Sequence, residues 1–343
     1  MKSIYYNWNK LLSYVWAFIF IVIGARGYGK TYRVKKFVLK DFKYNKRKFI
    51  WLRDTDAALE ELTKDDGKTF FDDVFTNEQC FKGCTGKIVG TTIFFNDEPC
   101  GLIMPARSYH KRKGNSYESY KNIVYDEFIP EDQQQYIGDR AKQFINTIST
   151  IGRTRKDYRV FMTANAIDKG DPILELLNIK IKGFGYYFNK KKGVVLHYAQ
   201  NSEEFNKKNS ESIAGRLIAD TRYADNILNN KFSNDDTLLF TKRKKCDIIG
   251  IYYNNKGEAV RIYRANDGSE YYACKDLSTT GYSYLRYVFD LSQVTEDKQL
   301  VGIEHRKFLT NLYASKMLRF ESRYIQTVFI DIVKKKKKKR SKL

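Results

Sequence analysis

The stretch from Ala17 to Thr31, AFIFIVIGARGYGKT, decides the fold. Its first part, Ala17–Ile23, is a continuous apolar run of the kind found in strands buried on both faces of a parallel sheet. Residues 24–31 then match the pattern G-x-x-x-x-G-K-[ST], and residues 32–40 can continue as a helix. A strand, a glycine-rich loop and a helix N-terminus in this order form an anion site, because backbone N–H groups and the helix dipole both favour phosphate. The stretch predicts a site for a nucleoside triphosphate.

The residue types in this loop have separate physical tasks. Lys30 is expected to reach the β- and γ-phosphates, and the Thr31 hydroxyl is expected to ligate Mg²⁺. Glycines permit backbone angles and close approaches that a Cβ atom would obstruct. The expected nucleotide-binding residues are Gly24, Ala25, Arg26, Gly27, Tyr28, Gly29, Lys30 and Thr31.

A second motif indicates what happens to the nucleotide. Residues 122–128 read NIVYDEF, a short apolar strand that ends in Asp126 and Glu127. In enzymes with this type of loop an acid at such a strand end holds the metal ion, so Asp126 is the second expected Mg²⁺ ligand. A neighbouring carboxylate, here Glu127, can orient and deprotonate a water that attacks the γ-phosphate. The adjacent acids therefore predict an ATPase that uses ATP and Mg²⁺, rather than a small-molecule kinase.

The composition favours a polyanionic partner. The formal net charge is +22, and residues 334–343 supply eight of those charges, so +14 remains without them. Such an excess attracts nucleic acid or an anionic membrane surface. The apolar run Val15–Ile23 has nine residues, against about twenty for a membrane span, so no membrane partner is expected. Five cysteines, an odd number, form no disulfide framework and indicate reduced, cytosolic thiols.

Apolar segments that alternate with helical ones predict an α/β ATPase domain over residues 1–198, with a parallel, doubly wound sheet. Ligands bind at the carboxyl ends of the strands in such sheets, and Gly24, Arg53, Asp126 and Asn165 all fall at these ends. The expected elements are strands at Ala17–Ile23, Phe49–Leu52, Ile88–Phe95, Ile123–Tyr125 and Val160–Thr163, and a helix at Asp139–Ile151.

The remaining sequence predicts three further regions. Residues 199–236 are polar and are expected to form a linker or small lid. Residues 237–333 predict a smaller α+β domain with hairpin turns. Residues 334–343 form a basic tail whose like charges repel one another, so we expect it to be disordered when free. The elements expected in the second domain are strands at Asp247–Tyr253, Ala259–Tyr263 and Tyr271–Cys274, and one helix at His305–Val333.

The order of the motifs resembles a known family. GARGYGKT at 24–31, IVYDEF at 123–128, GRTR at 152–155 and VFMTANA at 160–166 are similar to motifs of the DNA-packaging ATPases of small tailed bacteriophages in the phi-twenty-nine-like group. GRLI at 215–218 looks like the linker of that family. The resemblance implies an N-terminal P-loop ATPase domain of the ASCE type with a RecA/FtsK-like sheet. It further implies a C-terminal domain that is RNase H-like and inactive as a nuclease.

The same resemblance implies partners and a cellular setting. It implies a homo-oligomeric ring, a pentamer, that translocates double-stranded viral DNA into a procapsid. The ring is expected in the host cell cytoplasm, attached transiently to the procapsid portal. The C-terminal domain is expected to bind packaging RNA or the portal, and whether the basic tail contacts DNA, RNA or portal stays open.

Two basic residues match family positions that act on the nucleotide of a neighbouring subunit. Arg153 matches the arginine that reaches into the neighbour's site. Lys113 matches a second basic residue acting in trans, but Lys111 and Arg112 precede it, so the register stays open.

Two further residues receive roles within their own subunit. Asn165, at the end of a strand, matches a sensor of the γ-phosphate. Arg53 is expected to pair with Glu127 and keep it idle between turnovers. For Arg53, a side chain that faces phosphate or solvent stays an alternative.

Rival functions stay open at this point. A motor of the large-terminase type would carry an active nuclease, which needs several converging carboxylates. Other ASCE translocases or helicases, and a nucleic-acid-binding protein that does not hydrolyse ATP, share parts of the pattern. The lysine-rich flank at 242–245 favours an inactive nuclease. The candidate nuclease carboxylates are Asp247, Glu258, Asp267, Glu270, Asp276 and Asp290.

Overall fold

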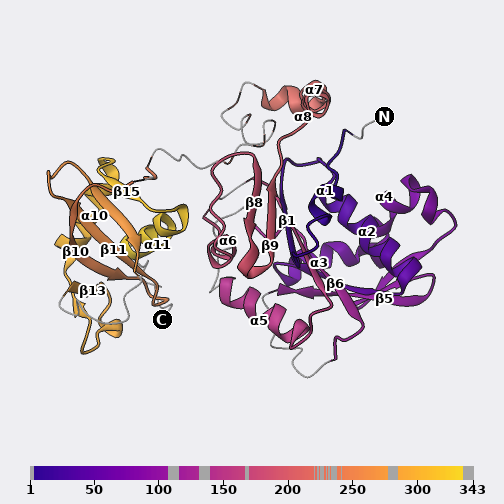
Figure 1. The fold of residues 1–343 in the computed structure, drawn as a ribbon, viewed down its shortest axis with the longest axis horizontal. Helices are drawn as coiled ribbons and strands as arrows, with labels where there is room; N and C mark the ends of the chain where they lie inside the picture. Colours follow the sequence, from indigo (N-terminus) through magenta and orange to yellow (C-terminus); the bar gives the residue numbers. More distant parts are fainter. Residues whose placement is uncertain are drawn as a thin grey trace, which may run out of the picture. The chain divides into compact units, whose positions relative to one another are not determined.

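The computed structural model contains two compact units, residues 1–168 with 172–233 and residues 169–171 with 234–343 (Figure 1). It describes residues 4–106, 116–130, 140–166, 170–219, 238–240, 242–276 and 285–334, and single residues between 221 and 232. Each unit has its own sheet and its own apolar core.

One mixed sheet organises the described part of the first unit. Its strand order is β3-β4-β5-β2-β6-β7-β1-β9-β8. The strands from β5 to β9 in this order pair in parallel, whereas β3, β4 and β5 pair antiparallel at one edge and β8 pairs antiparallel with β9 at the other. The bounds are β1 Ile19–Ile23, β2 Lys48–Arg53, β3 Gly86–Val89, β4 Thr92–Phe95, β5 Glu98–Pro105, β6 Tyr120–Tyr125, β7 Arg159–Ala164, β8 Gly185–Asn189 and β9 Val194–Tyr198.

The predicted α/β fold with a parallel sheet is confirmed, and four predicted strands correspond to β1, β2, β6 and β7. The single strand predicted at Ile88–Phe95 is wrong. The chain reverses at Gly90, whose φ of 60° lies in the left-handed region that favours glycine. β3 and β4 therefore form an antiparallel hairpin in which Val89 pairs with Thr92.

Helices cover both faces of this sheet. Phe20 and Val22 of β1 belong to one apolar cluster, which also contains Phe42 of α2. Ile21 of the same strand belongs to the cluster on the other face, together with Phe144 of α5. This alternation buries β1 completely, as its apolar sequence predicts. The helices of the unit are α1 Asn9–Leu12, α2 Lys30–Asn45, α3 Asp56–Thr63, α4 Lys68–Asn77, α5 Arg140–Gly152, α6 Pro172–Leu176, α7 Glu203–Glu211 and α8 Ile213–Ile218.

The segment predicted as a linker or lid contains α7 and α8. Ser202 and Ser212 cap these helices, because their hydroxyl groups accept hydrogen bonds from the N–H groups of Phe205 and Gly215 at 3.2 and 2.9 Å. A Cβ atom at Gly215 would lie 1.9 Å from the carbonyl oxygen of Asn209, so the close approach of the first turn of α8 to α7 requires glycine.

The second unit has a smaller sheet in the order β14-β13-β10-β11-β12-β15. Its antiparallel β10, β11 and β12 lie where hairpin-linked strands are predicted. The bounds are β10 Cys246–Tyr253, β11 Ala259–Ala265, β12 Tyr271–Lys275, β13 Arg286–Val288, β14 Gln299–Leu300, β15 Leu318–Phe320, α10 Ile303–Ala314 and α11 Arg323–Val333.

The one long helix predicted at His305–Val333 is wrong. The helical pattern is interrupted at Lys316, whose φ of 58° ends α10. The next residues return to the sheet, and β15 pairs in parallel with β12 before α11 begins. Residues 335–343 of the predicted tail lie outside the described residues.

No helix in the described residues is both long enough and apolar enough to cross a membrane.

Candidate nucleotide-binding site

The loop between β1 and α2 is shaped by two glycines. Gly27 and Gly29 have φ values of 70° and 83°, which other residues adopt only with strain. Gly29 precedes the first residue of α2, and its carbonyl accepts the N–H of Arg33 at 3.0 Å. The N–H groups of the first turn of α2 are thus left for a ligand at this end, as the sequence predicts.

Lys30 begins α2 and is almost fully buried. Its Nζ donates hydrogen bonds to the carbonyl oxygens of Gly24 at 2.8 Å and Ala25 at 2.6 Å, and to Oδ1 of Asn165 at 3.1 Å. Burial lowers the pKa of Lys30 to about 8, although the negative charges of Asp126 and Glu127 oppose this shift. An anion in the pocket would therefore stabilise the protonated amine.

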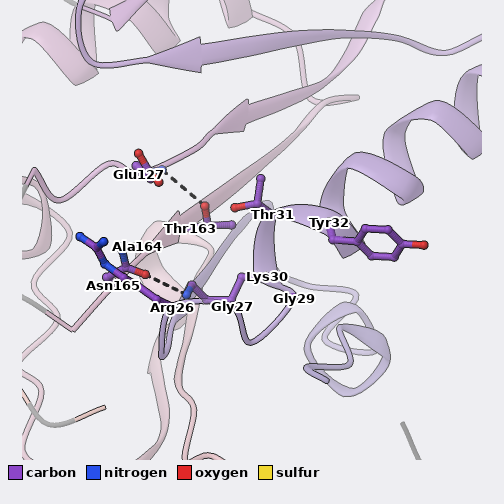
Figure 2. A pocket seen from close by; sticks show the side chains of 10 residues that line it. All are labelled: Arg26, Gly27, Gly29, Lys30, Thr31, Tyr32, Glu127, Thr163, Ala164 and Asn165. Atoms are coloured by element: carbon purple, nitrogen blue, oxygen red, sulfur yellow. Dashed lines mark hydrogen bonds between the residues drawn. The ribbon is translucent and has the colours of Figure 1, made fainter. Parts of the chain in front are cut away.

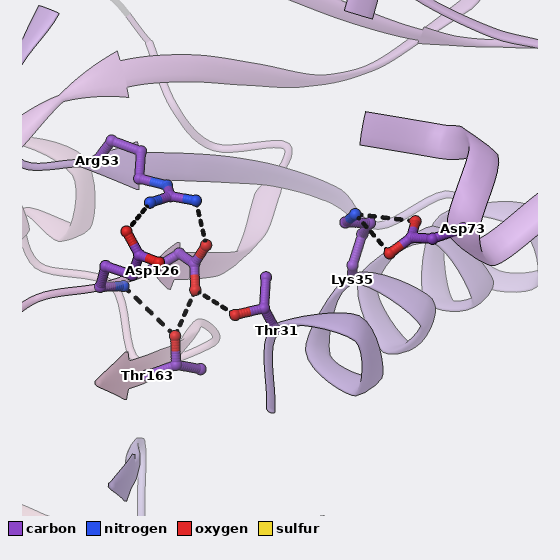
Figure 3. A network of polar contacts seen from close by, with 7 residues as sticks. Thr31, Lys35, Arg53, Asp73, Asp126 and Thr163 are labelled. Carbon is purple, nitrogen blue, oxygen red and sulfur yellow. Dashed lines mark hydrogen bonds and ion pairs between the residues drawn. The ribbon is translucent and has the colours of Figure 1, made fainter. Parts of the chain in front are cut away.

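Asp126 follows β6 and is fully buried. Its Oδ1 accepts hydrogen bonds from the Thr31 hydroxyl, at 2.7 Å, and from the Thr163 hydroxyl (Figure 3). Its Oδ2 forms an ion pair with Arg53, 2.9 Å from Nη2. The Thr31 hydroxyl and the Asp126 carboxylate are the hard oxygen ligands that Mg²⁺ prefers. These two residues fit the predicted metal.

Glu127 is far more exposed than Asp126. Its side chain is 56% exposed, and it forms an ion pair with Arg53. Its backbone φ of 54° lies in the left-handed region, and its N–H donates to the Thr163 hydroxyl at 3.4 Å. Strained non-glycine residues of this kind concentrate at functional sites. The sharp turn separates the two acids, so that Asp126 lies beneath the loop while Glu127 lines the pocket.

These groups surround one pocket of about 520 Å³ at the carboxyl ends of the parallel strands (Figure 2). It lies where ligands bind in open parallel sheets. The lining residues are Arg26, Gly27, Gly29, Lys30, Thr31, Tyr32, Glu127, Thr163, Ala164 and Asn165.

Three of the predicted loop residues do not line this pocket. Gly24 and Ala25 contribute carbonyl oxygens that hold Lys30. The ring of Tyr28 packs instead on Phe205, with ring centroids 4.8 Å apart, and on Tyr6 at 6.0 Å. Its side chain supports the loop from the core.

Of the predicted trans-acting residues, the structure describes Arg153, and this residue does not line the pocket. Arg153 is exposed and follows α5 with a φ of 50°. Arg155, two residues on, donates to the carbonyl oxygen of Tyr120 at 3.0 Å, where β6 begins. Asp126 follows the opposite end of the same strand, so Arg153 lies toward the far edge of the sheet from the pocket of its own chain. Lys113, with Lys111 and Arg112, lies outside the described residues.

Thr163 and Tyr32 are site residues that the sequence interpretation missed. Thr163 is a polar residue inside the apolar run VFMTA of β7, which is the signal that was available. Tyr32 directly follows the Lys-Thr pair of the loop motif.

The candidate nuclease carboxylates of the second unit do not form a metal site in the described residues. Asp267 pairs with Lys244 at 3.0 Å, and Glu258 accepts the hydroxyl of Tyr324 at 2.7 Å. Asp276 forms an ion pair with Arg261. Among the described residues, no group of three or more His, Cys, Asp or Glu side chains is placed to hold a metal ion.

One edge of the sheet carries a loop of the phosphate-binding type, a buried acid and an exposed acid. The chain is therefore a mixed α/β protein with a candidate nucleotide site. The chain belongs to the podovirus DNA encapsidation protein (Gp16) family, whose model matches residues 1–338. The family resemblance and the DNA-packaging function predicted from the sequence are thereby confirmed.

Individual relatives agree with this membership. The DNA packaging protein of Bacillus phage phi29 is 27% identical over 342 residues, covering 97% of this chain and 98% of that protein. The fold is similar to a chain of the bacteriophage Phi-29 viral genome packaging motor assembly, with a TM-score of 0.71, 21% identity, and coverage of 96% and 98% of the two chains. The N-terminal domain of the DNA packaging ATPase from bacteriophage phi29 matches with 27% identity and a TM-score of 0.50, covering 59% of this chain and 99% of that domain.

Proposed function

We propose that this chain is the ATP-hydrolysing subunit of a ring motor that translocates double-stranded viral DNA into a procapsid. The observation that carries the proposal is the convergence of Lys30, Thr31, Asp126 and Glu127 on one site at the carboxyl edge of the sheet. The similarity to a packaging motor assembly and to a DNA packaging ATPase supports it.

The loop and α2 bind the triphosphate. The N–H groups of the first turn of α2 point to the phosphates, and Lys30 exchanges its bonds to Gly24 and Ala25 for bonds to phosphate oxygens. Thr31 and Asp126 would hold Mg²⁺, which would supply positive charge beside the phosphates. We assign to Asn165, whose side chain accepts a hydrogen bond from Lys30, the role of sensing the γ-phosphate.

Glu127 orients the attacking water and removes its proton. Arg53 pairs with Asp126 (Figure 3) and also with Glu127. We assign to Arg53 the role of keeping Glu127 idle, because the ion pair occupies the carboxylate that would otherwise hold the attacking water. Arg153 acts on the nucleotide of the neighbouring subunit, together with a basic residue of the 111–113 segment.

The proposal also covers the domains of the chain and its assembly. The first 198 residues are an ASCE-type ATPase domain, residues 199–236 a linker, residues 237–333 an RNase H-like domain without nuclease activity, and residues 334–343 a basic tail. The working assembly is a pentameric ring on the procapsid portal in the host cytoplasm, with packaging RNA as a further partner. The paired carboxylates of the second unit favour the inactive nuclease.

Substitution of Lys30 by Ala tests the nucleotide site. The variant is expected to lose ATP affinity itself, because the buried ammonium group that faces the phosphates is removed. The measurement is direct ATP binding, followed by steady-state turnover with Mg²⁺. Lys40→Ala, on the exposed side of the same helix, is the control. Unchanged ATP affinity in Lys30→Ala would contradict the assignment of this pocket.

Substitution of Thr163 by Val tests the support of the metal acid. It removes the hydroxyl that donates to Asp126 and accepts the N–H of Glu127. Loss of a hydrogen bond that orients a metal ligand lowers metal affinity or activity by about 10–100-fold. We expect the Mg²⁺ concentration for half-maximal ATP turnover to rise by that order. Thr163→Ser, which keeps the hydroxyl, should stay close to wild type, and equal behaviour of the Val and Ser variants would refute the role.

A further inference from the structure

The pocket has two chemically different ends. Lys30, Thr31 and Glu127 mark the place of the β- and γ-phosphates. Tyr32 also lines the pocket, and it lies across the start of α2 from Glu127 and Asn165 (Figure 2). A nucleotide whose γ-phosphate lies beside Glu127 therefore extends its nucleoside toward Tyr32.

The ring of Tyr32 is held in place from outside the pocket. Its hydroxyl donates to Oε1 of Glu78 at 2.8 Å. Glu78, the residue after α4, is fixed in turn by an ion pair with Lys36, one helical turn beyond Tyr32. A side chain fixed before binding loses little entropy when a ligand stacks on it.

Part of this ring is available for stacking, although Tyr32 also packs in part against the apolar core of the first unit. Tyr32 is partly exposed, and no other aromatic ring or cation stacks on it among the residues that the structure describes. Most tyrosines near the loop differ in this respect, since the rings of Tyr6 and Tyr28 pack against each other and against further aromatic rings. Tyr32 is thus an ordered aromatic surface at the nucleoside end of a phosphate pocket.

We propose that Tyr32 is the stacking platform for the purine base of the bound nucleotide. The inference rests on the proposed function, because it assumes that a nucleoside triphosphate occupies this pocket. Stacking uses the π-face that every base has, so Tyr32 contributes affinity for the nucleoside without distinguishing adenine from guanine. The contact is independent of the phosphates, and this separates it from the roles of Lys30 and Thr31.

Binding of two ligands to three variants tests the inference. ATP has a base, whereas inorganic tripolyphosphate has only the phosphates. Tyr32→Leu is expected to weaken ATP binding by about tenfold, the order that an aromatic–base contact supplies, while tripolyphosphate affinity stays unchanged. Tyr32→Phe keeps the ring but loses the hydrogen bond to Glu78, so it should weaken ATP binding less than Tyr32→Leu does and leave tripolyphosphate affinity unchanged. Tyr44→Leu removes an exposed tyrosine near the other end of α2 and serves as the matched control.

The outcomes separate this inference from the proposed function. If wild type binds ATP and Tyr32→Leu binds it equally well, the platform is refuted and the nucleotide site stands. If Tyr32→Leu loses affinity for tripolyphosphate as much as for ATP, Tyr32 shapes the loop and does not stack on the base, which also refutes it. If wild type binds neither ligand, the proposed function itself fails.

Discussion

Replacement of Arg153 by Ala is expected to slow ATP turnover of the assembled ring by about 10³–10⁵-fold, the contribution of an arginine that neutralises charge on the transferring phosphoryl group. Arg153 lies at the C-terminal end of α5, toward the sheet edge opposite its own pocket. Any direct contact of Arg153 with a nucleotide is therefore expected at the pocket of a neighbouring subunit. The measurement is steady-state turnover, with Lys156→Ala in the same exposed turn as the control.

Mixed rings give the sharper form of this prediction. Lys30→Ala subunits carry an intact Arg153, and Arg153→Ala subunits carry an intact pocket. An interface at which an intact pocket faces an intact Arg153 should regain activity. The ATP turnover of a mixture should therefore exceed the summed turnover of the two separate variants. If the turnover of the mixtures never exceeds that sum, Arg153 acts on the nucleotide of its own subunit or has no role in hydrolysis.

The second large effect is expected at Glu127. Substitution by Gln should keep ATP binding while turnover falls by about 10²–10⁴-fold, because a general base is lost and the shape of the side chain is retained. The half-exposed position of Glu127 beside the pocket, in contrast to the buried Asp126, is the structural reason for assigning it the proton transfer. ATP affinity and turnover are measured on the same preparation. Near-normal hydrolysis would rule out Glu127 as the base.

Arg53 connects these two acids. Its guanidinium spans Asp126 and Glu127, so release of Glu127 requires Arg53 to turn away or the nucleotide to compete for it. The resemblance to the family implied the pairing with Glu127, and the structure shows this ion pair. The sequence interpretation did not foresee that Arg53 also reaches Asp126, since side-chain reach depends on the pairing of β2 with β6.

The sequence predicted the elements with strong local signals. The apolar run before the loop, the loop motif and the Asp-Glu strand end were placed correctly, since each combines burial with a residue pattern of fixed spacing. The segments 88–95 and 305–333 were predicted wrongly, because a left-handed residue inside a periodic run changes the chain direction without changing its hydropathy. The strands β5, β8 and β9 were missed altogether.

The polar contacts depended on tertiary structure. Thr163 comes next to Asp126 only because β6 and β7 are neighbours in the sheet. Tyr28 belongs to the loop motif, yet its ring joins Phe205 in the core, and nothing in the loop pattern distinguishes a supporting side chain from a binding one. Conversely, Tyr32 reaches the pocket from just beyond the motif.

The most direct test of the account is ATP-driven packaging of double-stranded DNA into procapsids, measured as DNA protected from nuclease. Wild type is expected to protect DNA only when ATP and Mg²⁺ are supplied. Glu127→Gln is expected to bind ATP and protect none, because hydrolysis at this pocket drives translocation. Protection of DNA by Glu127→Gln at the wild-type level, or by wild type without ATP, would contradict the central claim.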